Sequence, residues 1–187
     1  MPLHRIHRRH RSGAEFNPCK GGPSRFAPLF DAGGNCVPTI YAGSDFTSAI
    51  HESIFHDVPL RGNRSIRESL LDELAYSILV PRADLIFANL TSEGLMKMKA
   101  PHSLVECEPD GYAQTVLWAR AIHQDHPAVS GLFWVSRRYN EGRATMLFDD
   151  RIATRTLEVQ HGPIPLRYFQ TEIGSIAARC DIDINRR

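Results

Sequence analysis

Short apolar runs, separated by glycine and proline, recur along most of the chain. Runs of this kind, bounded by turn-forming residues, are typical of β-strands. They predict strands at residues 3–8, 39–42, 74–80, 85–89, 131–136 and 145–148. No internal repeat is visible, so the pattern indicates one irregular folded unit rather than an array of similar modules.

Three other stretches carry the signals of helices. Residues 46–55 follow Ser44 and Asp45, either of which can serve as an N-cap. Residues 112–123 repeat apolar side chains with a helical period, and residues 91–98 open with Thr-Ser-Glu, a helix-start signal. Because the strands do not alternate regularly with helices, we expect an α+β fold, with short strands in a mixed sheet and helices flanking it.

The size of the chain is sufficient for a substantial core. It has 187 residues, of which 42% are hydrophobic, and we expect a single domain over residues 1–187. Lys and Arg number 22 against 21 Asp and Glu, a formal net charge of +1. This balance produces no global field that would attract nucleic acid or a membrane, so partners must be inferred from local groups.

The sequence favours a cytoplasmic protein without membrane contact. No apolar run is long enough to cross a bilayer, and the basic N-terminus lacks the apolar block of a signal peptide. The cysteines, Cys19, Cys36, Cys107 and Cys180, include no Cys-x-x-Cys pair. We therefore expect free thiols in a reducing cytosol, and neither a zinc knuckle nor a redox motif.

Common nucleotide and metal motifs are absent from the sequence. There is no Gly-x-x-x-x-Gly-Lys-Ser/Thr phosphate loop and no Gly-x-Gly-x-x-Gly dinucleotide motif. His51 and His56 resemble the zinc helix His-Glu-x-x-His, but one extra residue places their imidazoles about 140° apart around a helix. His4, His7 and His10 are better explained as part of a solvated basic edge. We expect no bound metal.

Five residues far apart in the chain carry side chains suited to a nucleotide: Arg5, Arg25, Tyr41, Glu52 and Ser136. Guanidinium groups bind phosphates, an aromatic ring stacks on a planar heterocycle, and a carboxylate stabilises positive charge on a sugar. Each residue alone has an ordinary explanation, as a core aromatic, an exposed helix carboxylate, a strand end or a cation lying along a loop. Together they predict a site for a nicotinamide dinucleotide.

The basic N-terminus leaves a second interpretation open. Arg5, Arg8, Arg9 and Arg11 could contact the phosphates of RNA or DNA. Aromatic residues are not interleaved with them, so we favour a solvated strand edge for the last three and keep Arg5 for the nucleotide site. A non-catalytic module that binds nucleic acid or protein is the alternative of another class.

The same residues lie in segments that resemble the RES-domain family, named for an Arg, a Glu and a Ser. The resemblance covers most of the chain, and its segments are, in order, Arg5; Phe16-Asn17-Pro18 with Ser24-Arg25-Phe26-Ala27-Pro28; Ile40-Tyr41-Ala42-Gly43-Ser44 with Ala49 and Glu52; Trp134-Val135-Ser136-Arg137-Arg138; and Leu147-Phe148-Asp149. Each segment is short, but their order is specific. Ser24 stands where the family commonly has glycine, and the loop between Arg25 and Tyr41 is longer than in many relatives.

The resemblance implies an ADP-ribosyltransferase-like fold and a bacterial toxin that consumes NAD⁺ by hydrolysis, phosphorolysis or ADP-ribosyl transfer to a protein. It also implies neutralisation by an Xre-type antitoxin, through which any contact with nucleic acid would run. We expect Glu52 to be the catalytic carboxylate and Ser136 to orient Glu52 or the nicotinamide ribose. Arg5 and Arg25 are expected to bind the pyrophosphate, and Tyr41 to stack on nicotinamide. Whether water, phosphate or a protein accepts the ADP-ribosyl group is left open.

Overall fold

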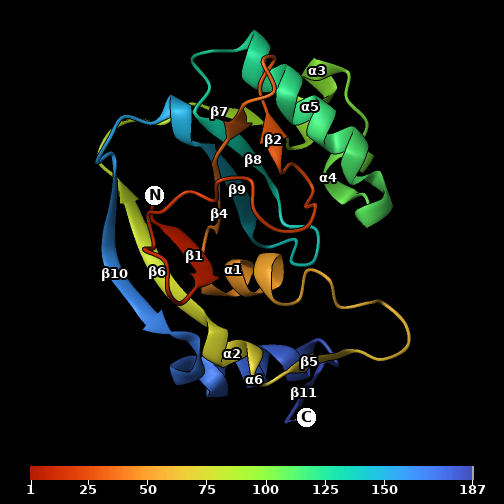
Figure 1. Cartoon of the computed structure of the whole chain (residues 1–187). Coiled ribbons are helices and arrows are strands. Elements are labelled where there is room, and N and C mark those ends of the chain that lie inside the picture. The colour runs from red at the N-terminus through yellow and green to blue at the C-terminus, as the bar shows by residue number, and fades with distance from the viewer. Residues whose placement is uncertain (187) are drawn as a thin grey trace.

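A seven-stranded sheet forms the centre of the fold in the computed structural model, which describes residues 1–186 (Figure 1). In spatial order its strands are β10 (Leu157–Pro165), β6 (Leu74–Pro81), β1 (Leu3–Arg8), β4 (Thr39–Gly43), β9 (Arg143–Phe148), β8 (Gly131–Val135) and β7 (Phe87–Asn89). Neighbouring strands are antiparallel except for β7 and β8, which are parallel. Two small sheets pair β2 (Leu29–Phe30) with β3 (Cys36–Val37), and β5 (Ser65–Arg67) with β11 (Asp183–Asn185).

The helices gather in two groups with α1 between them (Figure 1). Beside β7 and β8 lie α3 (Ser92–Met98), α4 (Ser103–Glu106) and α5 (Tyr112–Asp125). The other group, α2 (Leu70–Glu73) and α6 (Gln170–Arg179), lies at the N-terminal end of β6. Helix α1 (Phe46–Ser53) packs on β1 and β4. Short 3₁₀ turns are formed by η1 (Pro109–Gly111), η2 (Asp149–Arg151) and η3 (Leu166–Phe169).

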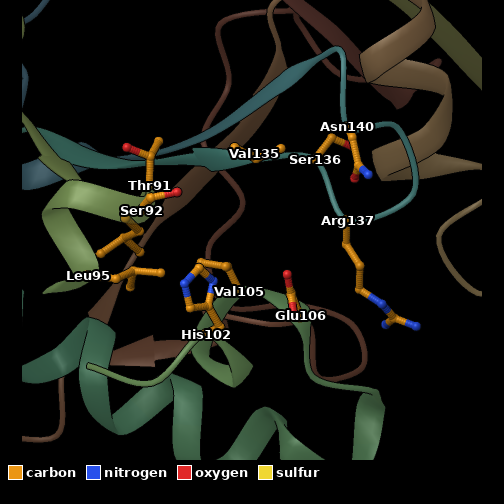
Figure 2. A pocket seen from close by; sticks show the side chains of 11 residues that line it. Thr91, Ser92, Leu95, His102, Val105, Glu106, Val135, Ser136, Arg137 and Asn140 are labelled. Carbon is orange, nitrogen blue, oxygen red and sulfur yellow. The ribbon is translucent and has the colours of Figure 1, made fainter. Parts of the chain in front are cut away.

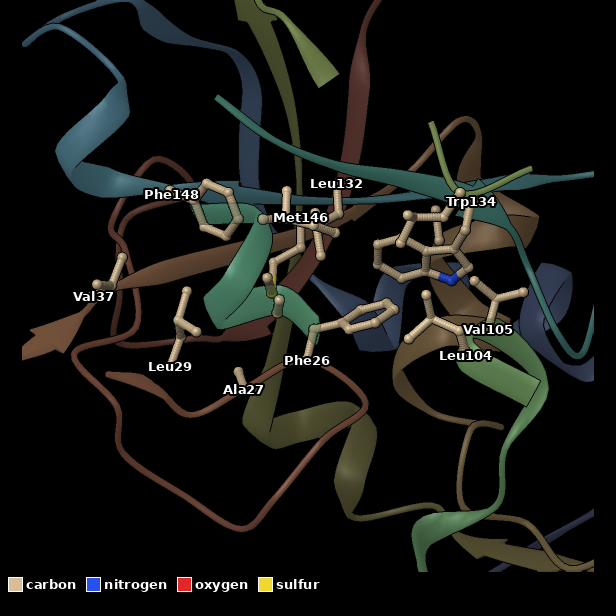
Figure 3. Close-up of a cluster of buried hydrophobic side chains, with 14 of the residues drawn as sticks. Phe26, Ala27, Leu29, Val37, Leu104, Val105, Leu132, Trp134, Met146 and Phe148 are labelled. Atoms are coloured by element: carbon tan, nitrogen blue, oxygen red, sulfur yellow. The ribbon is translucent and has the colours of Figure 1, made fainter. Parts of the chain in front are cut away.

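Separate hydrophobic cores support the two groups of helices. One core packs α4 and α5 against β8 and β9 and includes Phe26, Trp134 and Phe148, each fully buried (Figure 3). The other packs α1 and α6 against β6 and includes Ile50 and Ile173. Because Phe26 belongs to the first core, its burial anchors the loop that also carries Arg25.

Most of the predicted elements are confirmed. The predicted strand at residues 3–8 coincides with β1, and Asp45 caps α1, its side chain accepting a hydrogen bond of 2.8 Å from the Ser48 backbone N–H. The mixed helix and strand architecture also agrees with the predicted fold class. Strand β10 was missed because it is a largely exposed edge strand and therefore lacks a long apolar run.

Cys19 and Cys36 form a disulfide, so the expectation of free thiols is wrong for this pair, whereas Cys107 and Cys180 are free. The pairing of β2 with β3 brings together two cysteines that are 17 residues apart. The spacing of the cysteines along the chain does not reveal this hairpin. The disulfide closes the loop that contains Arg25.

Within residues 1–186, none of the helices combines the length and the apolar character that a membrane span requires.

Candidate active site

Three of the predicted residues meet at one place. The Ser136 hydroxyl donates a hydrogen bond of 2.7 Å to Oε1 of Glu52, and Nη1 of Arg25 lies 4.0 Å from Oε2 of the same carboxylate. Ser136 is fully buried, and the side chains of Arg25 and Glu52 are 2% and 8% exposed. A carboxylate and a guanidinium cation from distant parts of the chain therefore face each other, and both are largely shielded from water.

Each of these side chains comes from a different element. Glu52 lies in the last turn of α1, whose start is fixed by the Asp45 cap. Ser136 directly follows β8, and Arg25 lies in the loop before β2. Since α1 packs on β4 while β4 pairs with β9 and β9 with β8, the sheet carries the end of β8 close to the end of α1.

The guanidinium group of Arg25 is incompletely paired. Its Nε and Nη2 atoms are buried and have no hydrogen-bond partner within residues 1–186. Buried donors without partners are rare in folded proteins, because each loses its hydration without compensation. The arrangement is that of a cation ready to receive an anionic ligand.

Tyr41 is hydrogen-bonded through its hydroxyl to the loop that carries Arg25. The backbone N–H of Phe26 donates to the phenol oxygen at 3.0 Å, and the Ser24 hydroxyl donates to it at 3.1 Å. Burial raises the pKa of Tyr41 to about 12, so the phenol is neutral at physiological pH. The ring meets Trp134 edge-on, with the centroids 6.0 Å apart. These contacts hold the loop that carries Arg25, and the stacking of Tyr41 on nicotinamide stays a prediction.

Arg5 lies on β1, at a cavity of about 440 Å³ that Tyr41 also lines and whose lining does not include Glu52. The remaining lining residues are Ile6, His7, Arg8, His10, Arg11, Asn17, Lys20, Gly21 and Thr39. Cations or imidazoles dominate this wall, and none of the described lining residues is acidic. Arg5 is buried, donates to the Gly13 carbonyl, and has its pKa lowered to about 10 by burial, with a smaller contribution from Arg11. The cavity is suited to an anion.

The basic residues around Arg5 are partly neutralised. Arg8 pairs with Glu73, and Arg11 with Glu15 at 3.3 Å. The expected strand edge is wrong, because β1 lies inside the sheet between β6 and β4 and ends at Arg8. Arg5 has no carboxylate within ion-pairing distance in the described part of the chain.

A second cavity, also of about 440 Å³, adjoins Ser136 on the side of α3 and α4 (Figure 2). Thr91, Ser92 and His102 face it from one side, and Val135, Ser136 and Asn140 from the other (Figure 2). At its edge Arg137 donates to the Cys107 carbonyl at 3.0 Å and to the Glu108 carboxylate. The sequence carried no motif for this cavity, because its polar residues come from three separate segments.

The histidines considered for a metal site have ordinary protein neighbours in the described part of the chain. His51 is buried and stacked on Tyr139, with ring centroids 5.2 Å apart, whereas His56 accepts from or donates to the Tyr112 hydroxyl at 2.9 Å. Helix α1 ends at Ser53, so His56 lies beyond it and the two imidazoles do not share the helix on which the sequence argument placed them. Residues 1–186 contain no group of three or more His, Cys, Asp or Glu side chains that could hold a metal ion.

Comparison with known proteins identifies a family and a similar fold among the solved structures. The model of the RES domain matches residues 2–167. The fold is similar to a chain in the crystal structure of the M. tuberculosis MbcT-MbcA toxin-antitoxin complex, with a TM-score of 0.64 and 14% sequence identity, covering 92% of this chain and 88% of that one. No curated protein sequence matches this chain.

Proposed function

This chain belongs to the RES-domain family, and we propose that it is the toxin of a bacterial toxin-antitoxin pair that cleaves the nicotinamide–ribose bond of NAD⁺. The observation that carries the proposal is the contact between Ser136, Glu52 and Arg25. These three residues match the Arg, Glu and Ser segments of the family resemblance, and they converge in space although the chain separates them widely.

Glu52 is the catalytic carboxylate in this proposal. Cleavage breaks the bond between C1′ of the ribose and the pyridine nitrogen, and both bonding electrons leave with nicotinamide, which departs as a neutral molecule. The ribose develops positive charge in the transition state, and a fixed carboxylate in a site of low polarity stabilises that charge. The hydrogen bond from Ser136 occupies Oε1 and holds the carboxylate in one orientation.

Arg25 and Arg5 bind the pyrophosphate of the same substrate. The unpaired Nε and Nη2 atoms of Arg25 supply two donors in the fork geometry that phosphate oxygens accept. The cationic cavity at Arg5 supplies a second region of positive potential. Tyr41 lines this cavity, and its hydroxyl accepts a hydrogen bond from the loop that carries Arg25. Tyr41 stacks on the nicotinamide ring in the bound state.

The acceptor of the ADP-ribosyl group is water or inorganic phosphate, giving hydrolysis or phosphorolysis. The cavity beside Ser136 has room for such a small second reactant (Figure 2). Transfer to a side chain of a specific protein target is the alternative outcome of the same bond cleavage.

We assign the protein to the cytoplasm, where NAD⁺ is available and where the Cys19–Cys36 pair is open to reduction. We assign its neutralising partner to the Xre type of antitoxin. The structural neighbour was crystallised as a toxin-antitoxin complex, which supports an antitoxin as the partner class. The antitoxin is also the route by which the pair would contact DNA.

The test is to incubate the purified protein with NAD⁺, with and without phosphate, and to identify the products by mass spectrometry. Free nicotinamide with ADP-ribose indicates hydrolysis, and a phosphorylated ADP-ribose that depends on added phosphate indicates phosphorolysis. Intact NAD⁺ after prolonged incubation with folded protein contradicts the proposal.

A further inference from the structure

The peptide unit between Arg25 and Phe26 is held at both of its ends by side-chain hydroxyls. The Thr115 hydroxyl on α5 donates to the Arg25 carbonyl, and the Phe26 N–H donates at 3.0 Å to Tyr41 on β4. Helix α5 and strand β4 thus both form hydrogen bonds with a single peptide group. Its orientation determines the direction in which the Arg25 side chain leaves the backbone.

Thr115 is placed to make this contact and is itself 3% exposed. Its hydroxyl also lies 3.1 Å from the Tyr112 carbonyl, three residues earlier in α5, which is the usual local acceptor for a threonine in a helix. A hydroxyl has one proton to donate, so the contact with Arg25 competes with that local bond. Within residues 1–186 no other donor reaches the Arg25 carbonyl.

The backbone matters here because the guanidinium group makes few contacts of its own. Two of its nitrogens have no hydrogen-bond partner among the described residues, and the third lies 4.0 Å from Glu52. A bidentate contact with phosphate requires the fork to be placed within about 0.5 Å. The placement of Arg25 before substrate arrives must therefore come from the loop and from what holds it.

From this geometry we propose that Thr115 is a positioning residue, which acts on the substrate through the Arg25–Phe26 peptide unit. The inference rests on the proposed function, since it takes Arg25 to bind the pyrophosphate of NAD⁺. Because the pyrophosphate lies away from the bond that breaks, loss of this positioning weakens binding in the ground state and the transition state alike. The expected effect is on KM, with kcat nearly unchanged.

The experiment compares Thr115→Val with Thr115→Ser, which keeps the hydroxyl. Thr115→Val is expected to raise the KM for NAD⁺ roughly tenfold, with kcat within about twofold of the wild type. Thr115→Ser is expected to keep the wild-type KM. Thr145→Val is the matched control, because Thr145 is also buried and its hydroxyl donates at 3.3 Å to a different carbonyl, that of Ala42. If Thr115→Val does not fold, Thr115→Cys, with its weaker donor, replaces it.

A second measurement separates this inference from the proposed function. Hydrogen exchange of the Phe26 amide, followed by NMR, is expected to be faster in Thr115→Val than in the wild type, and unchanged in Thr145→Val. This readout does not depend on NAD⁺, so an inactive wild-type protein would refute the proposed function and leave the test of Thr115 standing. Unchanged exchange at Phe26, or an unchanged KM in an active Thr115→Val protein, would overturn the positioning role.

Discussion

Ser136 and Glu52, which are 84 residues apart in the chain, are joined by a hydrogen bond of 2.7 Å from Oγ to Oε1. The bond leaves Oε2 as the carboxylate oxygen without a hydroxyl partner, and this oxygen faces Arg25. The carboxylate therefore has one fixed oxygen and one oxygen directed toward the incompletely paired cation.

Removing the hydroxyl of Ser136 is expected to slow turnover while substrate affinity is kept. In Ser136→Ala the Glu52 carboxylate loses its orienting donor, and we expect kcat to fall roughly tenfold, about 1.4 kcal/mol of transition-state stabilisation. Steady-state kinetics with NAD⁺ measures the effect. Ser130→Ala, at another buried serine, is the control. A wild-type kcat in folded Ser136→Ala would remove Ser136 from the site.

Arg25→Lys is expected to weaken NAD⁺ binding although the positive charge is kept. Lysine is a point charge on a flexible chain and does not provide the planar pair of donors that Nε and Nη2 present. We expect the Kd for NAD⁺, measured by calorimetry with an inactive Glu52→Gln background, to rise about tenfold. An unchanged Kd would place Arg25 outside the binding site.

Breaking the Cys19–Cys36 disulfide is expected to destabilise the fold. The bond closes a loop between cysteines 17 residues apart, for which the loss of chain entropy in the unfolded state corresponds to about 3 kcal/mol. Urea unfolding of the oxidised protein with and without a thiol reductant measures this difference. The double variant Cys19→Ser, Cys36→Ser should match the reduced protein and show no response to reductant. Equal midpoints for oxidised and reduced wild type would contradict the expectation.

Acidification is expected to destabilise the protein below about pH 6.5. Burial lowers the pKa of His7 and His51 below the unfolded value of 6.5, so the unfolded chain binds more protons than the fold in that range. Stability due to these histidines is full above pH 6.5 and declines as the pH falls toward their folded pKa. The slope is at most about 1.4 kcal/mol per pH unit for each histidine.

Urea midpoints at pH 7.5 and 5.5 test this dependence, with His51→Asn expected to reduce the slope. Replacing the exposed His126 should leave it unchanged. A midpoint that rises on acidification would contradict the lowered pKa of these histidines, because protonation would then favour the folded state.

The sequence indicated candidate residues for a site but not the contacts among them. Arg25, Glu52 and Ser136 were singled out as candidates by their chemistry and order, and they meet in the structure. Helix α1 was predicted because Asp45 is an N-cap with a direct physical role. Their convergence depends on the order of strands in the sheet, which local patterns do not encode.

Other features could not be predicted because local sequence leaves them ambiguous. An aromatic residue on a short strand can stack on a ligand or hold a loop, and only the structure shows the Tyr41 hydroxyl at the Phe26 N–H. Likewise, Thr115 is one threonine within a helical pattern, and its contact with Arg25 joins residues 90 positions apart. The Cys19–Cys36 pair depends on a two-residue hairpin pairing that composition does not reveal.

The central claim, that Glu52 performs NAD⁺ cleavage, is tested most directly by the rate of nicotinamide release in Glu52→Gln. We expect the variant to fold with the wild-type melting temperature and to lose activity by about 10²-fold or more, roughly 3 kcal/mol of transition-state stabilisation. Glu172→Gln, at an exposed position on α6, should retain full activity. Nicotinamide release at the wild-type rate by folded Glu52→Gln protein would contradict the claim.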